Sequence, residues 1–150
     1  MRSAFFVSVL MMLSGCGGMS DWHGDPGANV CVNGFSPEQH AEVLGALEEW
    51  RAKSDGLVTL PVDPTIPCEL QIDGVTALES GAVGDRLFNQ IRIDVDPADG
   101  PESFRIIALH EIGHFLTGSE HSPREEDVMH YRYRASQSGL TDRDAARLFH

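Results

Sequence analysis

The chain is poor in basic residues. Its 150 residues contain 11 Lys and Arg against 23 Asp and Glu, for a formal net charge of −12 at pH 7. Such a charge repels nucleic acid and anionic lipid surfaces, so the sequence predicts neither as a partner. With a hydrophobic content of 41%, a chain of this length has room for one small domain with a single core.

The amino-terminal hydrophobic run is short. After Arg2, residues 4–13 are mostly apolar, which is too short for a permanent membrane-spanning helix but typical of an export signal. Residues 13–16, Leu-Ser-Gly-Cys, are similar to the lipobox of bacterial lipoproteins. The resemblance implies cleavage before Cys16, acylation of Cys16 and a lipid-anchored place in the bacterial cell envelope, in the periplasm or at the outer membrane and cell surface. A plain secretory signal is the alternative.

Cysteine is also scarce, with 3 residues in the chain. If Cys16 carries lipid, Cys31 and Cys68 remain, and an oxidising compartment favours a disulfide between them. Closing a loop of that length would stabilise a small domain by roughly 3 to 4 kcal/mol. A pair of buried free thiols is the alternative. We therefore divide the chain into a signal peptide (1–15), a flexible tether (16–33) and a folded domain (34–150).

Local patterns predict two helices at the ends of that domain. Ser36, Pro37 and Gln39 form a helix start with a capping box, and apolar residues at helical spacing continue to about Lys53. Thr141 is the predicted cap of a short terminal helix.

Between these helices we expect strands at 57–62, 69–72 and 91–95, with a loop through Gly81 and Gly84. Isoleucine and valine alternate with charged residues in 91–95, which favours an edge strand. The end of this segment loosely resembles a calcium loop, with Asp94, Asp96, Asp99 and Gly100. These residues match no complete motif, so we expect turn formation rather than Ca²⁺ binding.

A buried helix is predicted from about Pro101 to Thr117, and it contains the pattern His-Glu-x-x-His at residues 110–114. Residues four apart share a helix face, so His110 and His114 can bind one metal ion while Glu111 reaches a metal-bound water. The motif arises by chance in about 2% of chains of this composition. The alternative is that both histidines are core residues hydrogen-bonded to the backbone. However, burying two histidines and a glutamate in an apolar helix costs free energy unless they have partners, and a metal ion is such a partner.

Residues 110–131 resemble the metzincin metallopeptidases, in which a third histidine and a methionine-containing turn follow the helix. The resemblance implies a zinc site of His110, His114 and His121 with Met129 beneath it. It also implies a small α+β domain. The spacing from His121 to Met129, and residues 140–144, look like the matrixin branch. Residues 128–131 look instead like the methionine turn of astacins and serralysins, which implies an oxyanion role for Tyr131.

One feature departs from the metzincin pattern. Thr117 stands where the family has glycine, and Gly118 and His121 each come one residue late, as if one residue were inserted at the helix end. Glu120 is the alternative third ligand, since it occupies the family's offset from His114. The carboxylates of Glu126 and Asp127 are weaker candidates.

These residues predict a zinc-dependent endopeptidase. Zinc would lower the pKa of a bound water and polarise the scissile carbonyl, while Glu111 moves the proton to the leaving amine. An extended peptide would add to the predicted edge strand at 90–95. The alternative is a non-catalytic, zinc-stabilised surface lipoprotein that binds a protein partner.

Overall fold

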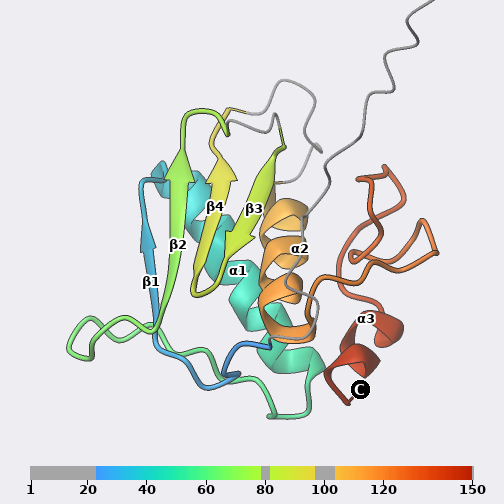
Figure 1. The fold of residues 1–150 in the computed structure, drawn as a ribbon, viewed down its shortest axis with the longest axis horizontal. Helices are drawn as coiled ribbons and strands as arrows, with labels where there is room; N and C mark the ends of the chain where they lie inside the picture. Colours follow the sequence, from blue (N-terminus) through green and yellow to red (C-terminus); the bar gives the residue numbers. More distant parts are fainter. Residues whose placement is uncertain (1–22, 79–81, 97–103, 150) are drawn as a thin grey trace, which may run out of the picture.

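Four short strands form a mixed sheet, with two long helices beside it (Figure 1). The computed structural model describes residues 23–78, 82–96 and 104–149. The strands are β1 (Val30–Asn33), β2 (Leu70–Val75), β3 (Gly84–Leu87) and β4 (Gln90–Asp94), in the spatial order β1-β2-β4-β3. β1, β2 and β4 are parallel, and β3 runs antiparallel to β4. The predicted α+β class is confirmed.

Helix α1 (Pro37–Lys53) has the bounds that the sequence predicts. The Gln39 amide donates to the Ser36 hydroxyl and the Ser36 amide donates to the Gln39 side chain, which satisfies two amides that a helix start leaves without partners. The buried face of α1 consists of Val43, Ala46, Leu47 and Trp50. The Trp50 indole donates to the carbonyl of Leu109, so α1 is bonded directly to the second long helix.

Helix α2 (Phe104–Thr117) is buried at every residue from Ile106 onward. It lies beside β3 in Figure 1, with α1 crossing behind the sheet. The predicted start near Pro101 lies outside the described residues. Thr141 caps the short helix α3 (Asp142–Ala146), as predicted, and a 3-10 turn η1 (Arg147–Phe149) follows it. Among the described residues, no helix is both long and apolar enough to cross a membrane.

The position predicted for the edge strand is wrong. β4 lies between β2 and β3, and the outer strand on the side of α2 is β3, in a stretch predicted as loop. The alternation itself is correct, because Ile91 and Ile93 are fully buried. Arg92, which lies between them, points to the other face of the sheet and forms an ion pair with Asp85 of β3. A tight connection at Phe88 and Asn89 joins the two strands.

The strand predicted at 57–62 is also wrong. Val58 and Leu60 are buried, as their alternation suggests, but the segment is irregular. The amides of Thr59 and Leu60 donate to the carbonyl of Pro26, and the Arg51 side chain donates to the carbonyls of both residues. The Pro61 carbonyl accepts from the Val30 amide, so scattered bonds to separate parts of the chain replace the regular ladder of a strand.

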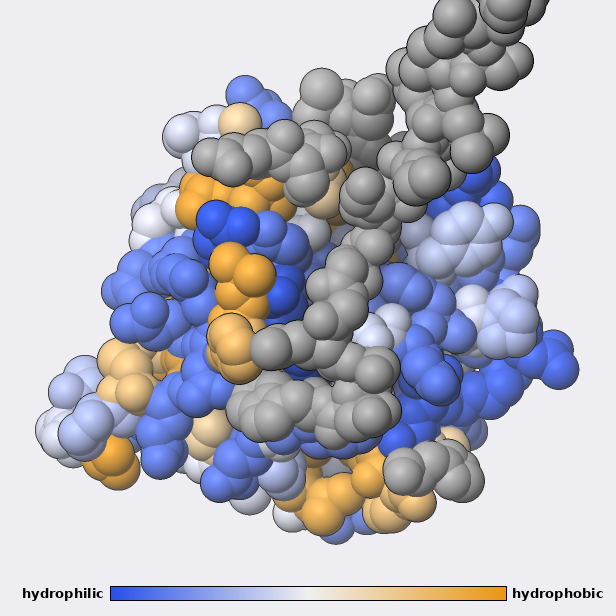
Figure 2. All heavy atoms as spheres, viewed as in Figure 1, coloured by the Kyte–Doolittle hydropathy of each residue, from blue (hydrophilic) through white to orange (hydrophobic). Residues whose placement is uncertain are grey.

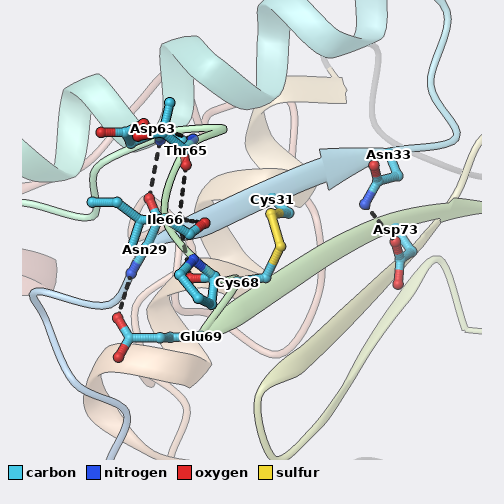
Figure 3. The surroundings of a disulfide bond; sticks show 10 residues. Asn29, Cys31, Asn33, Asp63, Thr65, Ile66, Cys68, Glu69 and Asp73 are labelled. Carbon is cyan, nitrogen blue, oxygen red and sulfur yellow. Dashed lines mark hydrogen bonds between the residues drawn. A yellow bond between two sulfur atoms is a disulfide. The ribbon is translucent and has the colours of Figure 1, made fainter.

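Cys31 and Cys68 form the predicted disulfide, with their Cα atoms 5.7 Å apart (Figure 3). The bond joins β1 to the loop before β2. Asn29 ties down the same loop, because its side-chain amide donates to the carbonyls of Asp63, Ile66 and Pro67. The tether predicted for residues 16–33 is therefore wrong over β1, whose residues 30–33 belong to the sheet.

The surface agrees with the polar composition. The face seen in Figure 2 is largely hydrophilic, with apolar side chains in separate spots. At the aspartates that loosely resemble a calcium loop, the Asp94 carboxylate accepts a hydrogen bond from the amide of Asp96, as expected of a turn. Asp99 and Gly100 lie outside the described residues.

Candidate metal centre

His110 and His114 are buried, and their rings lie perpendicular to each other with centroids 4.6 Å apart. The Nδ1 atom of His110 lies 2.7 Å from the carbonyl oxygen of Val128, and that of His114 lies 2.9 Å from the carbonyl oxygen of Gly118. A carbonyl only accepts, so both Nδ1 atoms carry the ring proton and donate. Both Nε2 atoms are therefore left as lone pairs, and they are 3.0 Å apart.

Two lone pairs at that distance repel each other unless a cation lies between them. Two tetrahedral ligands, each about 2 Å from a zinc ion, are about 3.3 Å apart, which is close to the observed separation. Burial lowers the pKa of His110 to about 3 and that of His114 to about 4, so both rings are neutral near pH 7. Neutral imidazole is the form that binds a metal, so the two residues fit a zinc ion.

His121 completes a cluster of three histidines. Its ring centroid lies 5.3 Å from that of His110 and 4.7 Å from that of His114, and one nitrogen from each of the three rings lies within 4.8 Å of the others. Glu120 is exposed and stays outside the cluster. The Asp127 carboxylate is also absent from it, since it accepts hydrogen bonds from Ser122, Thr141 and Arg143.

The added residue is accommodated at the helix end. α2 continues through Thr117, and Gly118 then takes a φ of +85°, a left-handed conformation that glycine adopts without strain. The Gly118 amide donates to the carbonyl of His114 and closes the last turn. Four residues later the Ser122 amide donates to the carbonyl of Met129, so the loop between them returns to the cluster.

Glu111 points from α2 toward the outer strand. A Cβ atom on Gly84 of β3 would lie 2.6 Å from its Oε1 atom, so the glycine makes room for the carboxyl group. Oε2 is buried and has no hydrogen-bond partner among the described residues. Burial, and to a lesser extent the nearby Asp85 carboxylate, raise the pKa of Glu111 to about 8, although the Arg86 guanidinium acts in the opposite direction. An orphaned buried carboxyl beside the histidines fits a nearby cation.

Met129 lies fully buried beneath the helix. A Cβ atom on Gly113 would lie 2.2 Å from its sulfur, so the helix approaches this closely only at a glycine. The Asp144 carboxylate of α3 accepts hydrogen bonds from the amides of Val128 and Met129 and holds the turn in place. Met129 therefore has the position of the packing floor that the resemblance implies.

Tyr131 does not stand at the cluster. Tyr131 is 59% exposed, and its ring lies against the ring of His130 and the guanidinium of Arg132. The tyrosine ring that contacts the cluster is that of Tyr133, 5.5 Å from His110. The oxyanion role predicted for Tyr131 loses its geometric basis, because consecutive residues in the irregular turn point in different directions.

Sequence reasoning overlooked three further residues beside the cluster: Gly84, Arg86 and Tyr133. Arg86 donates from β3 to the carbonyl of His114, 2.6 Å away, and so joins the outer strand to the end of the metal helix. Neither Gly84 nor Arg86 is part of a recognisable motif. Tyr133 had a usable signal, since it lies only four residues after Met129.

A metal helix beside a mixed sheet, with a third histidine and a buried methionine turn, defines a metzincin-type metallopeptidase. The chain belongs to the matrixin family, whose sequence model matches residues 21–148. A search of curated proteins finds no significant match to the chain. It is accordingly a zinc metallopeptidase, a hydrolase that acts on peptides or proteins.

Proposed function

We propose that this protein is a zinc-dependent endopeptidase in which one ion is held by His110, His114 and His121. The observation that carries this proposal is the pair of Nε2 lone pairs 3.0 Å apart, with the third histidine beside them and both Nδ1 protons already used. A set of three imidazoles is an established donor set for catalytic zinc and leaves one position open.

When bound, zinc polarises the scissile carbonyl and lowers the pKa of water in the site. The chain supplies the base. Glu111 is adjacent to a ligand but turned roughly 100° from it around the helix, so its carboxylate is free to take the proton of the attacking water. The same carboxyl group then gives that proton to the leaving amine. The cation favours the ionised carboxylate and offsets the burial that raises its pKa.

We further propose that an extended peptide pairs with β3 rather than with β4, which has strands on both sides. One side of β3 is bonded to β4, and in the described part of the chain no strand pairs with its other side. Glu111 packs against Gly84 on this strand, so a peptide aligned along β3 passes close to the base. Main-chain pairing of this kind favours peptides as substrates and requires little of their side chains.

Replacing Glu111 with Gln tests the mechanism, because glutamine keeps the size of the side chain and cannot take the proton. We expect zinc content to stay at one equivalent while turnover of a fluorogenic peptide library falls by roughly 10²- to 10⁴-fold. Glu48→Gln is the matched control, since Glu48 lies on the exposed side of α1 and should keep full activity. Full activity in Glu111→Gln would refute the mechanism. Zinc without turnover in the unmodified protein would favour the non-catalytic, partner-binding lipoprotein.

We also propose that Cys16 is acylated and anchors the protein in the bacterial envelope. The support is the lipobox-like sequence. His23 and Gly24 bond to the carbonyls of Leu116 and Phe115 at the end of α2, and residues 16–22 of the predicted tether lie outside the described residues. Metabolic labelling with a radioactive fatty acid should label the protein and not a Cys16→Ala variant. Equal labelling of both would refute the anchor.

A further inference from the structure

The loop that carries His121 is fixed at both ends and nearly free in its middle. Gly118 is bonded to His114, and Ser122 is bonded to Met129 and to Asp127. Between them, residues 119–121 make one hydrogen bond to the rest of the described structure. In it, Nη2 of Arg147 donates to the carbonyl of Glu120, 2.7 Å away. That carbonyl belongs to the peptide unit that leads into His121.

Arg147 is placed for this contact rather than for a surface ion pair. Arg143, one turn earlier, pairs with Asp127 and Glu126, whereas Arg147 has no carboxylate within ion-pair distance among the described residues. Its Nε atom is buried without a hydrogen-bond partner there. Burying part of a guanidinium without full pairing costs free energy, and in this position the bond to Glu120 is the compensating interaction.

The segment that carries Arg147 is held in place by hydrogen bonds. Arg147 directly follows α3, three residues after Asp144, whose carboxylate holds the amides of Val128 and Met129. One helical turn therefore connects the floor of the site to the loop of the third histidine. This connection matters more here than in a chain with the usual spacing, because the added residue before Gly118 moves the start of the loop by about 1.5 Å and 100°.

We propose, on the basis of the three-histidine zinc site above, that Arg147 is a positioning residue that holds His121 at the metal. It touches neither substrate nor metal. It acts through the backbone of Glu120, so its loss should weaken zinc binding through the third ligand. Residues that orient metal ligands typically change metal affinity by 10- to 100-fold when replaced.

The test measures the zinc dissociation constant by competition with a chromophoric chelator for wild type, Arg147→Ala and Arg147→Lys. We expect Arg147→Ala to bind zinc about 10- to 100-fold more weakly. Lysine can still donate to the carbonyl, so Arg147→Lys should recover part of this loss. Arg124→Ala removes the same charge from an exposed side chain near the loop and is the matched control, with wild-type zinc affinity.

A second measurement separates positioning from general stability. In a His121→Ala background, Arg147→Ala should weaken zinc binding no further, because the ligand it positions is already gone. The metal-free forms of the wild type and the Arg147 variants should melt at similar temperatures. If Arg147→Ala does not fold, Arg147→Gln, whose shorter side chain removes the charge, replaces it in both backgrounds. It should bind zinc more weakly than the wild type when His121 is present, and it should cause no further loss when His121 is replaced by Ala.

Zinc affinity in Arg147→Ala equal to that of wild type would overturn the role of Arg147 and leave the zinc site intact. An equal loss in the presence and absence of His121 would also overturn it. If the wild-type protein binds no zinc, the proposed function fails instead, so the two failures are distinguishable. Cobalt substitution adds a spectroscopic readout, because loss of one imidazole changes the visible absorption of the bound ion.

Discussion

Replacing Gly84 with Ala should disable the general base without touching a metal ligand. The added Cβ atom would lie 2.6 Å from Oε1, 2.7 Å from Cγ and 2.8 Å from Cδ of Glu111. Reaching an ordinary contact of 3.4 Å requires a shift of about 0.8 Å by the carboxyl group or by β3. A misplacement of about 1 Å at a reacting group can cost about 10²-fold in rate, which is about 3 kcal/mol in the barrier.

The assay is kcat/KM on a fluorogenic peptide together with zinc content by atomic emission. We expect activity to fall by about 10²-fold while one equivalent of zinc is retained, because the three histidines come from other segments. Gly45→Ala is the control. Gly45 lies inside α1 with only the Arg105 side chain 4.0 Å away, so alanine fits and should stabilise the helix by up to about 1 kcal/mol. Near wild-type activity in Gly84→Ala would refute the packing of Glu111 against β3.

Three other predictions concern stability. Asp144→Asn replaces an accepting oxygen with a donor that faces buried amides of the methionine turn, so the free energy of unfolding in urea should drop by about 1 to 3 kcal/mol; an unchanged midpoint would contradict the role of this carboxylate. Reduction of the Cys31–Cys68 disulfide, whose ends have a sequence separation of 37, should remove about 4 kcal/mol, which denaturation with and without reductant will measure. The metal-free protein should be most stable near pH 6.5. Glu111 has a raised pKa of about 8, so its contribution to the free energy of unfolding is lost as the pH rises from about 4.5 to 8. His110 and His114 have lowered pKa values, so their contribution to the free energy of unfolding is lost as the pH falls from about 6.5 to 3. Thermal melts in excess chelator across this range check the maximum, and stability that rises steadily through pH 8 would contradict the burial of Glu111.

Features set by neighbours in the chain were predictable from the sequence. The cap of α1 at Ser36 and the cap of α3 at Thr141 depend on side chains three residues away, and both are present. The shared face of His110 and His114 follows from helical periodicity alone. The pairing of Cys31 with Cys68 was predictable by elimination, once Cys16 was set aside. The caps and the helix face involve residues three or four apart, whereas the disulfide followed from the number of cysteines alone.

Edges, loops and turns depended on partners far away in the sequence. Ile91 and Ile93 alternate correctly for a half-buried strand, but no local pattern says that β3 covers its other side. Residues 57–62 show strand-like alternation and yet bond to Pro26. Tyr131 and Tyr133 are two residues apart in an irregular turn, and only the fold decides which ring meets His110.

The metal centre also has one part that follows from local sequence and one part that depends on distant segments. The sequence by itself determined the zinc helix, because two histidines and a glutamate on one helix need only the helix to be arranged. The tertiary structure decided which side chain joins them as the third member of the cluster. His121 rather than Glu120 reaches the other histidines because Gly118 turns the chain, Ser122 returns it and Arg147 holds the loop between them. Those contacts come from segments up to 29 residues beyond Gly118, and the spacing of residues along the chain does not contain them.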